Sequence, residues 1–363
     1  MALFNRITVR RLPVDAAAIE PITVCIPARD EVRRLPRLIG DLRAQTGVPR
    51  MQVLILDDAS SDGTGTAAAA AIGDDPRFIM VRSDTEPEPG WTGKAAACAR
   101  LAELVDTAVL VFLDADVRLA PGAIAAAVAE LRRSGAALVS PWPAQEAGSP
   151  TEALVQPLLC WSWASTLPVA LANRSLRPSM AVACGQFLAF DTAAYRVIGG
   201  HAAVAASPTE DLDIARALRR SGRHTTLVAA GPLARTRMYG SAAELDDGYT
   251  RWLWSAYGGS PLAGAAVGTV AALAYWLPPL AAVAGRGRTR RAGLLGSVAA
   301  VAARLLARST ETGGPLTRAD FRAALGHPLS IAAYARLSIR SHRARRNGDL
   351  RWKGRDLTIV RDA

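Results

Sequence analysis

Acidic residues follow the ends of apolar runs in this sequence, where they could hold a metal ion. Asp114 and Asp116 come directly after the run 109–113. Asp57 and Asp58 end a second run, where a carboxylate could instead accept hydrogen bonds from a nucleobase or ribose. Two carboxylates one residue apart repel each other unless a cation lies between them or one of them is protonated. Mg²⁺ or Mn²⁺, with phosphate oxygens completing its coordination shell, is the cation that such ligands favour. The alternative interpretation is a solvated turn or a helix cap.

Lys94, Glu210 and Asp211 are residue types that could act on a phosphate or a hydroxyl beside those acids. Lys94 begins an expected helix after "GWTG", where a cation and backbone N–H groups suit a phosphate. Glu210 and Asp211 begin another expected helix, and a carboxylate there could be the general base for an attacking hydroxyl. The structural alternatives are a solvated lysine and acids that stabilise a helix N-terminus. His201, after two glycines, is more typical of a turn or a core than of a site.

The elements expected around these residues alternate between strand and helix. Apolar runs predict strands at 22–28, 51–58, 77–83, 108–116 and 136–142, and helical periodicity predicts helices at 31–45, 93–105, 120–135 and 209–222. A strand pair and a short helix are expected in 180–200. Such alternation indicates an α/β fold with a mainly parallel open sheet flanked by helices. Ligands bind beyond the C-terminal strand ends of such sheets, and the acid clusters lie at those ends.

The formal net charge of +11 belongs to the C-terminal part of the chain. Residues 286–363 contain 17 Lys and Arg and 5 Asp and Glu, a net of +12, which leaves 26 and 27, a net of −1, for residues 1–285. A basic tail could bind nucleic acid or an anionic membrane surface. Nucleic acid is not expected as a partner, because the arginines flank Ala and Leu stretches with few aromatic residues for base stacking.

Apolar segments precede and interrupt this basic tail. Residues 252–285 carry no charge and can contain a membrane helix of about 20 residues, although Pro278 and Pro279 are expected to break it. A second apolar stretch contains Arg304, and four arginines lie between the two stretches. Because a crossing would place these arginines outside the cell, a re-entrant hairpin or an interfacial arrangement is the alternative. We therefore expect residues 256–363 to form a helical region associated with the cell membrane. The N-terminus lacks the apolar stretch of a signal peptide, so the remaining part is expected on the cytoplasmic side.

Four motifs resemble those of the family 2 glycosyltransferases of GT-A type, in the family's order. They are "IPARDE" at 26–31, "LDDASSDGT" at 56–64, "FLDADV" at 112–117 and "TEDLDIARALRRSG" at 209–222. A narrower set is similar to the subgroup of carotenoid and hopene-associated glycosyltransferases, which are membrane-bound enzymes acting on isoprenoid lipids. That set comprises "GWTGK", "SPWPAQE", "CGQFLAF", "AYRVIGGH", "TRMYGS" and "WKGRDL".

The resemblance implies a binding site for a nucleotide-sugar donor and a divalent metal, Mg²⁺ or Mn²⁺. Asp58 would bind the nucleobase, usually uracil. Asp114 and Asp116 would hold the ribose and the metal–diphosphate, with Asp116 as the better metal ligand. The donor-binding residues that the resemblance implies are Pro27, Ala28, Arg29, Glu31, Asp58, Lys94, Asp114, Ala115 and Asp116.

The resemblance also implies catalytic and acceptor residues. Asp211 would be the catalytic base, with Glu210 beside it. The pair Arg251-Trp252 resembles the end of the Q-x-x-R-W motif of processive relatives, but Gly248 stands at the glutamine position, so processive polymer synthesis is not expected. The candidates for acceptor or diphosphate contacts are Gly185, Gln186, His201, Arg251 and Trp252.

Together the sequence predicts an inverting, metal-dependent glycosyltransferase with a UDP-sugar as donor. The expected acceptor is a membrane lipid, an isoprenoid such as a carotenoid or hopanoid. The expected parts are an N-terminal extension (1–20), a GT-A catalytic domain (21–255) and a membrane-associated helical region (256–363). The alternatives are a polyprenyl phosphate or a saccharide as acceptor, a basic nucleic-acid-binding protein, and a sugar-nucleotide-binding membrane protein without turnover.

Overall fold

The chain forms two compact units in the computed structural model, which describes residues 1–357. The sheet unit comprises Val9–Ala144, Val169–Thr236 and Leu357. The helical unit comprises Met1–Thr8, Gln145–Pro168 and Arg237–Asp356. The chain passes several times between them, so neither unit is one continuous segment. The domain boundaries predicted at residues 20 and 255 separate continuous segments of the chain, and they stay a prediction.

An open sheet of eight strands forms the centre of the sheet unit, in the order β3-β2-β1-β4-β7-β6-β8-β5. Its strands are β1 (Ile22–Ala28), β2 (Met51–Asp58), β3 (Phe78–Ser83), β4 (Val109–Leu113), β5 (Val117–Leu119), β6 (Leu138–Gln145), β7 (Phe187–Asp191) and β8 (Thr225–Thr236). β1 is parallel to both β2 and β4, and β2 is parallel to β3. β7 runs antiparallel to β4 and β6, and β5 antiparallel to β8. The sheet is therefore mixed, and the predicted acids follow its parallel strands.

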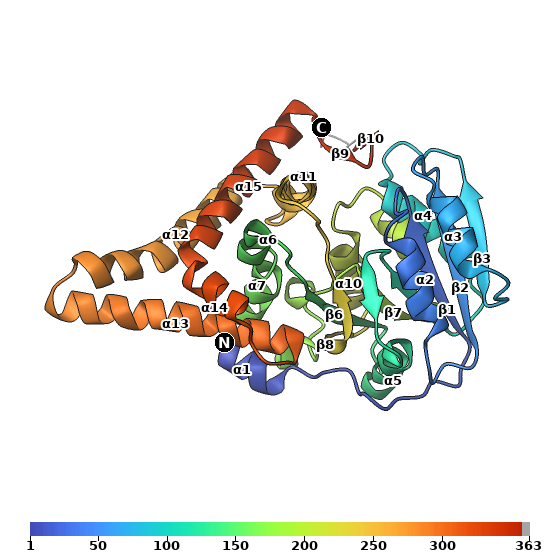
Figure 1. Cartoon of the computed structure of the whole chain (residues 1–363), viewed down its shortest axis with the longest axis horizontal. Helices are drawn as coiled ribbons and strands as arrows, with labels where there is room; N and C mark the ends of the chain where they lie inside the picture. The colour runs from blue at the N-terminus through green and yellow to red at the C-terminus, as the bar shows by residue number, and fades with distance from the viewer. Residues whose placement is uncertain (358–363) are drawn as a thin grey trace. The chain divides into compact units, whose positions relative to one another are not determined.

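Helices cover both faces of this sheet (Figure 1). One face is covered by α2 (Leu35–Arg43), α3 (Thr64–Ile72) and α5 (Ala123–Ser134). The other is covered by α4 (Gly93–Glu103), α9 (Thr192–Val197) and α10 (Glu210–Arg220). The remaining short helical segments of the unit are α8 (Val169–Ala172), η1 (Pro178–Met180) and η2 (Gly200–Val204).

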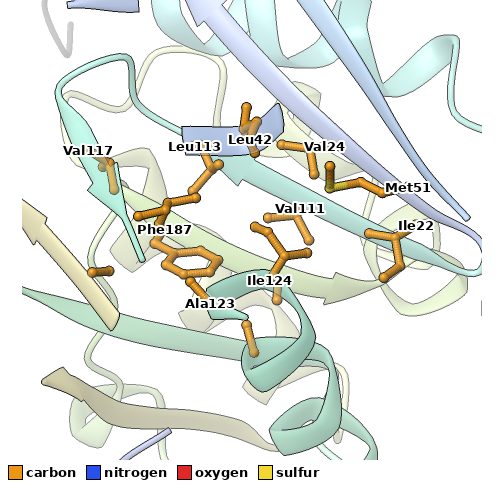
Figure 2. Packing of buried hydrophobic residues seen from close by; sticks show 14 of the residues in the cluster. Ile22, Val24, Leu42, Met51, Val111, Leu113, Val117, Ala123, Ile124 and Phe187 are labelled. Atoms are coloured by element: carbon orange, nitrogen blue, oxygen red, sulfur yellow. The ribbon is translucent and has the colours of Figure 1, made fainter. Parts of the chain in front are cut away.

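Residues two apart in the strands pack on the same layer of helices, because successive side chains point to opposite faces. Figure 2 shows Val24 and Val111 of neighbouring strands beside Leu42 of α2 and Ile124 of α5, all fully buried. Phe112, one residue on from Val111, belongs instead to the cluster on the opposite face. Parallel strands buried on both faces have continuous apolar sequences, which is why these runs could be recognised.

The expected strand pair in 180–200 is wrong, since this segment contains one strand, β7. The residues before it use their backbone N–H groups on side chains instead of a neighbouring strand. Cys184 N donates to Ser140 Oγ (2.8 Å), and Gly185 N donates to Asp211 Oδ2 (2.6 Å). The segment is therefore fixed as a loop.

The helical unit is built almost wholly of helices. They are α1 (Ala2–Thr8), α6 (Pro150–Val155), α7 (Leu158–Thr166), α11 (Ala242–Trp252), η3 (Leu253–Ser255), α12 (Pro261–Ala284), α13 (Gly287–Thr312), α14 (Arg318–Leu325) and α15 (His327–Asn347), followed by the short strands β9 (Arg351–Trp352) and β10 (Arg355–Asp356). Its core includes Val155, Tyr249, Leu253 and Leu337, all fully buried.

Two helices of this unit, α12 and α13, are long and apolar enough to cross a membrane. The expected break at Pro278 and Pro279 is wrong, since α12 continues through both prolines to Ala284. The prolines lie near the C-terminal end of the helix, so only its last turns lose hydrogen bonds. Close packing on α13 also holds this end: a Cβ atom on Gly293 would lie 2.6 Å from the Pro278 carbonyl oxygen.

Candidate functional site

Asp114 and Asp116, which form a D-x-D motif within "FLDADV", lie in a tight turn between β4 and β5. β4 ends at Leu113, and Asp114 and Asp116 flank the turn. Asp114 N donates to the Gln186 carbonyl (3.1 Å), and Val117 N donates to the Asp114 carbonyl (3.2 Å). The end of the buried strand thus fixes the position of Asp114, and the turn makes the two carboxylates point in different directions.

Lys94 joins the D-x-D motif to the acids of α10. Its Nζ lies 2.8 Å from Asp114 Oδ1 and 2.9 Å from Glu210 Oε1. Thr92 caps the start of α4 by accepting a hydrogen bond from Ala95 N (3.2 Å), which places Lys94 in the first turn. Burial alone would lower the pKa of Lys94, but the two carboxylates raise it well above its usual value. The cation predicted for a phosphate is therefore bound to two acids.

Asp211 lies beside this ion-paired group, on the same helix turn as Glu210. Its Oδ2 accepts a hydrogen bond from Gly185 N (2.6 Å), and its Oδ1 accepts one from Leu212 N (2.7 Å). Burial, and then the neighbouring charge of Glu210, raise the pKa of Asp211 to about 7. Burial would also raise the pKa of Glu210, but Lys94 outweighs it and the net shift is downward. The pKa of Asp211 is therefore raised, whereas the pKa of its neighbour Glu210 is lowered.

Gly185 is required for the approach of these groups. A Cβ atom at this position would lie 3.0 Å from Lys94 Nζ and 3.3 Å from Asp211 Oδ2. A side chain here would therefore crowd the lysine and the aspartate, which would have to move by a few tenths of an ångström. This glycine belongs to the quoted "CGQ" motif and was a candidate for acceptor or diphosphate contact.

Asp116 has an oxygen atom suited to a metal ion. Its Oδ1 is buried and has no hydrogen-bond partner among residues 1–357. Burial, followed by the charges of Asp114 and Glu31, raises the pKa of Asp116 to about 6. An unpaired buried carboxylate oxygen is costly, and a cation would remove that cost.

The metal ligands of the protein itself are few. No group of three or more His, Cys, Asp or Glu residues suited to a metal occurs within the described residues. Asp114 is bound to Lys94, so Asp116 is the carboxylate that fits the ion. Mg²⁺ commonly binds through one or two carboxylates and takes its other ligands from water and substrate phosphates. The carboxylates present would fit an ion of this kind, which takes its other ligands from water and substrate. They are too few to hold a metal that needs all its ligands from the protein.

The loops that follow β1 and β2 are joined to each other by hydrogen bonds. Arg29 Nη1 donates to the carbonyls of Asp58 (2.8 Å) and Ala59 (3.2 Å), and Glu31 N donates to Thr64 Oγ1 (2.7 Å). Pro27 and Ala28 precede this link as the last residues of β1, with Ala28 directly opposite Asp57 in the register. The motifs "IPARDE" and "DDASSDGT" therefore form one connected wall.

Two residues of this wall have strained backbones. Asp30 and Ala59 both have a φ of 51°, in the left-handed region that non-glycine residues seldom adopt. Asp30 N donates to Ser60 Oγ (3.0 Å), and Asp30 Oδ1 accepts from Ser61 N (2.9 Å). Such strain persists where surrounding bonds over-determine it, and it is concentrated at functional sites.

The other candidates are placed in different surroundings. Gln186 is buried, and its Nε2 donates to Thr236 Oγ1 (3.3 Å). His201 lies in the core, where its Nδ1 is 2.8 Å from Tyr195 Oη. Burial lowers the pKa of His201 to about 3, so it is neutral and has the character of a packing residue. Arg251 and Trp252 belong to the helical unit, in α11, and their acceptor role stays a prediction.

Thr236 was missed in the sequence. Its Oγ1 donates to the Asp116 carbonyl (3.2 Å) while accepting from Gln186, so it connects the D-x-D turn to the "CGQ" segment. The only signal was its place at the start of the quoted motif "TRMYGS". Nothing in that motif indicates that the end of β8 lies beside β5.

Comparison with known proteins gives a family match and two related enzymes. Residues 23–199 match the model of the family described as glycosyl transferase family 2. The 4,4'-diaponeurosporenoate glycosyltransferase of Staphylococcus haemolyticus is 27% identical over 239 residues, which cover 64% of this chain and 61% of that protein. The undecaprenyl-phosphate mannosyltransferase of Micrococcus luteus is 36% identical over 95 residues, which cover 26% of this chain and 37% of that protein. The chain thus matches less than two thirds of either relative.

A solved structure has the same fold. The mannosyltransferase PcManGT from Pyrobaculum calidifontis, in complex with GDP-Man and Mn²⁺, has a TM-score of 0.54 and 17% identity, with 90% of each chain covered. This similarity confirms the expected α/β fold of GT-A type. Three of the four predicted motifs, at 26–31, 56–64 and 112–117, lie within the family match, whereas the motif at 209–222 lies beyond it and stays a prediction. Residues 23–199 therefore resemble the family 2 glycosyltransferases, and the chain is similar to a carotenoid-associated member of that family.

Proposed function

We propose that the protein is an inverting, metal-dependent glycosyltransferase that transfers a sugar from a UDP-sugar to an isoprenoid lipid of the cell membrane. The observation that carries this proposal is the convergence of Lys94, Asp114, Glu210 and Asp211 from three separate elements, with the unpartnered Asp116 in the same turn as Asp114. The cluster lies beyond the C-terminal ends of parallel strands, where ligands of α/β sheets bind.

The donor would lie along the wall formed by the first two loops. Asp58 would bind the uracil, with Pro27, Ala28, Arg29 and Glu31 around the nucleotide. Asp116 would hold the Mg²⁺ or Mn²⁺ ion, whose role is to neutralise charge on the departing diphosphate. Ala115 and Asp114 would lie beside the ribose and the diphosphate. Asp114 would stay oriented by Lys94, which the structure pairs with it at 2.8 Å.

Asp211 would be the base that takes the proton of the acceptor hydroxyl. Each of its oxygens accepts one backbone hydrogen bond and keeps a second lone pair for the incoming proton. The acceptor oxygen would bond to the anomeric carbon as the bond from that carbon to the diphosphate oxygen breaks. A single displacement of this kind inverts the configuration at that carbon. A pKa of about 7 suits a general base at neutral pH.

A lipid acceptor is supported by the relatives and by the apolar helices. The two relatives are named for diaponeurosporenoate and undecaprenyl phosphate, which are both polyisoprenoid compounds. The helical unit has two helices long and apolar enough for a membrane. We place the sheet unit on the cytoplasmic side of the cell membrane. A polyprenyl phosphate is the second candidate acceptor, favoured by the Micrococcus relative.

Transfer of radiolabelled sugar into lipid tests this proposal. Membranes that contain the protein should move label from UDP-sugar into material extractable by organic solvent. A product stable to mild acid indicates a glycoside or ester of an isoprenoid, whereas an acid-labile product indicates a polyprenyl phosphate. Absence of label in lipid, with label in water-soluble saccharide instead, would overturn the lipid acceptor.

Asp211→Asn tests the catalytic assignment. Loss of the base should lower the transfer rate about 10²- to 10⁴-fold while UDP binding, measured by calorimetry with Mn²⁺, is unchanged. Asp213→Asn is the matched control on the same helix, because Asp213 bonds to Ser207 (2.7 Å) and Arg216 (3.0 Å) instead. Equal rates for Asp211→Asn and the unaltered protein would refute the role of Asp211.

A further inference from the structure

The helices α12 and α13 form a hairpin that leaves much apolar surface exposed. They pack along each other and are joined by residues 285–286 (Figure 1); the tip of the hairpin is this connection and the first turn of α13, residues 285–291. No residue of α12 is buried. Gly293 permits the close approach, since a Cβ atom there would lie 2.4 Å from Ala282 N. The large apolar side chains exposed along the hairpin include Leu262, Val270, Leu273, Leu277, Leu280, Val283, Leu294, Leu295 and Val298.

Although α13 as a whole is long and apolar enough for a membrane, its stretch without a charged residue is shorter than the hydrocarbon core of a bilayer. Arg304 is only 3% exposed, and its Nη2 donates to the Leu154 carbonyl (2.8 Å). One turn later Arg308 is ion-paired with Asp320 (2.9 Å). Residues 292–303 are the stretch before these charges, about 12 residues or 18 Å of helix. The hydrocarbon core of a bilayer is about 30 Å thick.

The segments that pack around the base of α13 carry charges of their own. Arg318 and Arg322 of α14 are exposed, and α14 packs against α13. If the hairpin tip crossed the membrane, these arginines would lie within the hydrocarbon. Charged side chains are costly there. The length and the charges together favour a hairpin that does not span the bilayer with both ends in water.

The tip carries a dense positive charge. Arg286, Arg288, Arg290 and Arg291 are all exposed, and none of them has an ion pair among residues 1–357. Burying these charges at mid-membrane would also be costly. Arginines at this density match the anionic headgroups of a membrane surface.

We propose that the α12–α13 hairpin is a monotopic anchor, which lies within one leaflet of an anionic membrane with its arginine tip among the lipid headgroups. The exposed apolar side chains of the hairpin enter the acyl region, as in interfacial helices. Exposed Leu3 and Ile7 of α1 and Phe321 of α14, both helices that pack on α13, add apolar surface near the base. This inference rests on the proposed membrane association and not on the proposed transfer reaction.

Thiol labelling of the full chain tests which side of the membrane the tip reaches. The four native cysteines are free and buried, so they give a low background. Thr289→Cys reports on the tip, and Asp74→Cys, also exposed, reports on the sheet unit. With a membrane-impermeant maleimide, both should react in closed vesicles of the same orientation. Reaction of the two cysteines from opposite faces would show that the hairpin spans the membrane and would overturn the proposal.

Vesicle flotation tests the lipid partner without any measurement of catalysis. Replacing Arg288, Arg290 and Arg291 by Gln should weaken partition onto phosphatidylglycerol-containing vesicles roughly a hundredfold. The matched control replaces Arg50, Arg174 and Arg220, three exposed arginines of the sheet unit, by Gln and removes the same charge. Equal losses for the two triple variants would overturn the role of the tip.

A second copy of the chain is the competing occupant of the apolar face. Analytical ultracentrifugation in mild detergent should find a monomer that binds vesicles. A dimer that fails to float with anionic vesicles would instead show that the hairpin is a contact between copies. Either result leaves the transfer assay unaffected, so failure of this inference and failure of the proposed function can be told apart.

Discussion

Lys94 is the residue on which the charge balance of the candidate site depends. It binds Asp114 and Glu210 at once, at 2.8 and 2.9 Å, in a largely buried position. Removing one partner from a buried ion-paired group leaves the remaining charges uncompensated. The same lysine would orient Asp114 toward the donor, so structure and binding depend on one ammonium group.

Replacement of Lys94 should therefore destabilise the fold. Lys94→Met is expected to lower the free energy of unfolding by about 3 kcal/mol, measured by urea denaturation. Adding Glu210→Gln to that variant should restore most of the loss, because one of the two unpaired carboxylates is then neutral. Lys353→Met is the control at the only other lysine. A loss of the same size in the control, or no recovery in the double variant, would contradict this interpretation.

Asp211 should give transfer a defined pH dependence. Its pKa is raised from 3.8 to about 7, so the ionised base is half formed near pH 7. The rate should rise about tenfold per pH unit below pH 7 and level off above it. The folded chain holds this proton more tightly than the unfolded chain, so the contribution of Asp211 to stability falls from about pH 4 to pH 7.

The two pH trends can be measured separately. Initial transfer rates at saturating UDP-sugar give the first, and thermal unfolding at the same pH values gives the second. Asp211→Asn should remove the first trend and weaken the second, which then keeps the contribution of Asp116, whose pKa is raised to about 6. A rate that stays level from pH 5 to pH 8 would mean that another group takes the proton.

At the scale of the elements, the strands were the most predictable part. The apolar runs at 22–28 and 51–58 coincide with β1 and β2, because strands covered on both faces are mostly apolar. The segment 180–200 was mispredicted, since the partners of its backbone N–H groups are the distant side chains of Ser140 and Asp211. Such long-range bonds leave no local pattern.

The location of the candidate site could be predicted from the sequence, but the contacts among its residues could not. Acids at strand ends must gather at one edge of a parallel sheet, so their convergence followed from the pattern. That Lys94 binds Asp114 and Glu210, and not a phosphate alone, depends on how α4 and α10 pack on the sheet. Residues 94, 114 and 210 come from separate elements. The spacing of residues along the sequence does not determine how closely those elements pack.

Helix α3 should be sensitive to a single methyl group at its start. A Cβ atom on Gly65 would lie 2.6 Å from Asp57 Oδ2, so Gly65→Ala should displace that carboxylate and destabilise the fold by about 1–3 kcal/mol. Gly40→Ala in α2 is the matched control, since nothing lies within 4 Å of its added methyl group. The control should gain about 0.5–1 kcal/mol from helix propensity. Chemical denaturation of both variants measures the difference, and equal effects would contradict the predicted clash.

At the scale of the whole molecule, the helical unit contains residues on both sides of the domain boundary predicted at residue 255. Tyr249 and Leu253 lie before that boundary, and Leu337, which packs in the same core, lies after it. Ser341 Oγ also donates to the Thr250 carbonyl (2.7 Å) across it. The helical unit therefore depends on residues from both parts.

A chain that ends at residue 255 should consequently lose the packed core of the helical unit. It is expected to aggregate, or to show weak near-ultraviolet circular dichroism, even in detergent. In the full chain, Leu337→Ala should cost about 2–5 kcal/mol, whereas Leu329→Ala, at a side chain 58% exposed, should cost little. A soluble, cooperatively unfolding fragment 1–255 would instead support the predicted boundary.

The charge at the hairpin tip is carried wholly by guanidinium groups, which has a consequence for control. Arginine does not lose its proton at any pH that a cell reaches, unlike histidine or an exposed amine. A change of pH therefore cannot release the tip from the membrane by removing its charge. Attachment would follow the composition of the bilayer, so the cell could set the amount of bound enzyme by changing its anionic lipids.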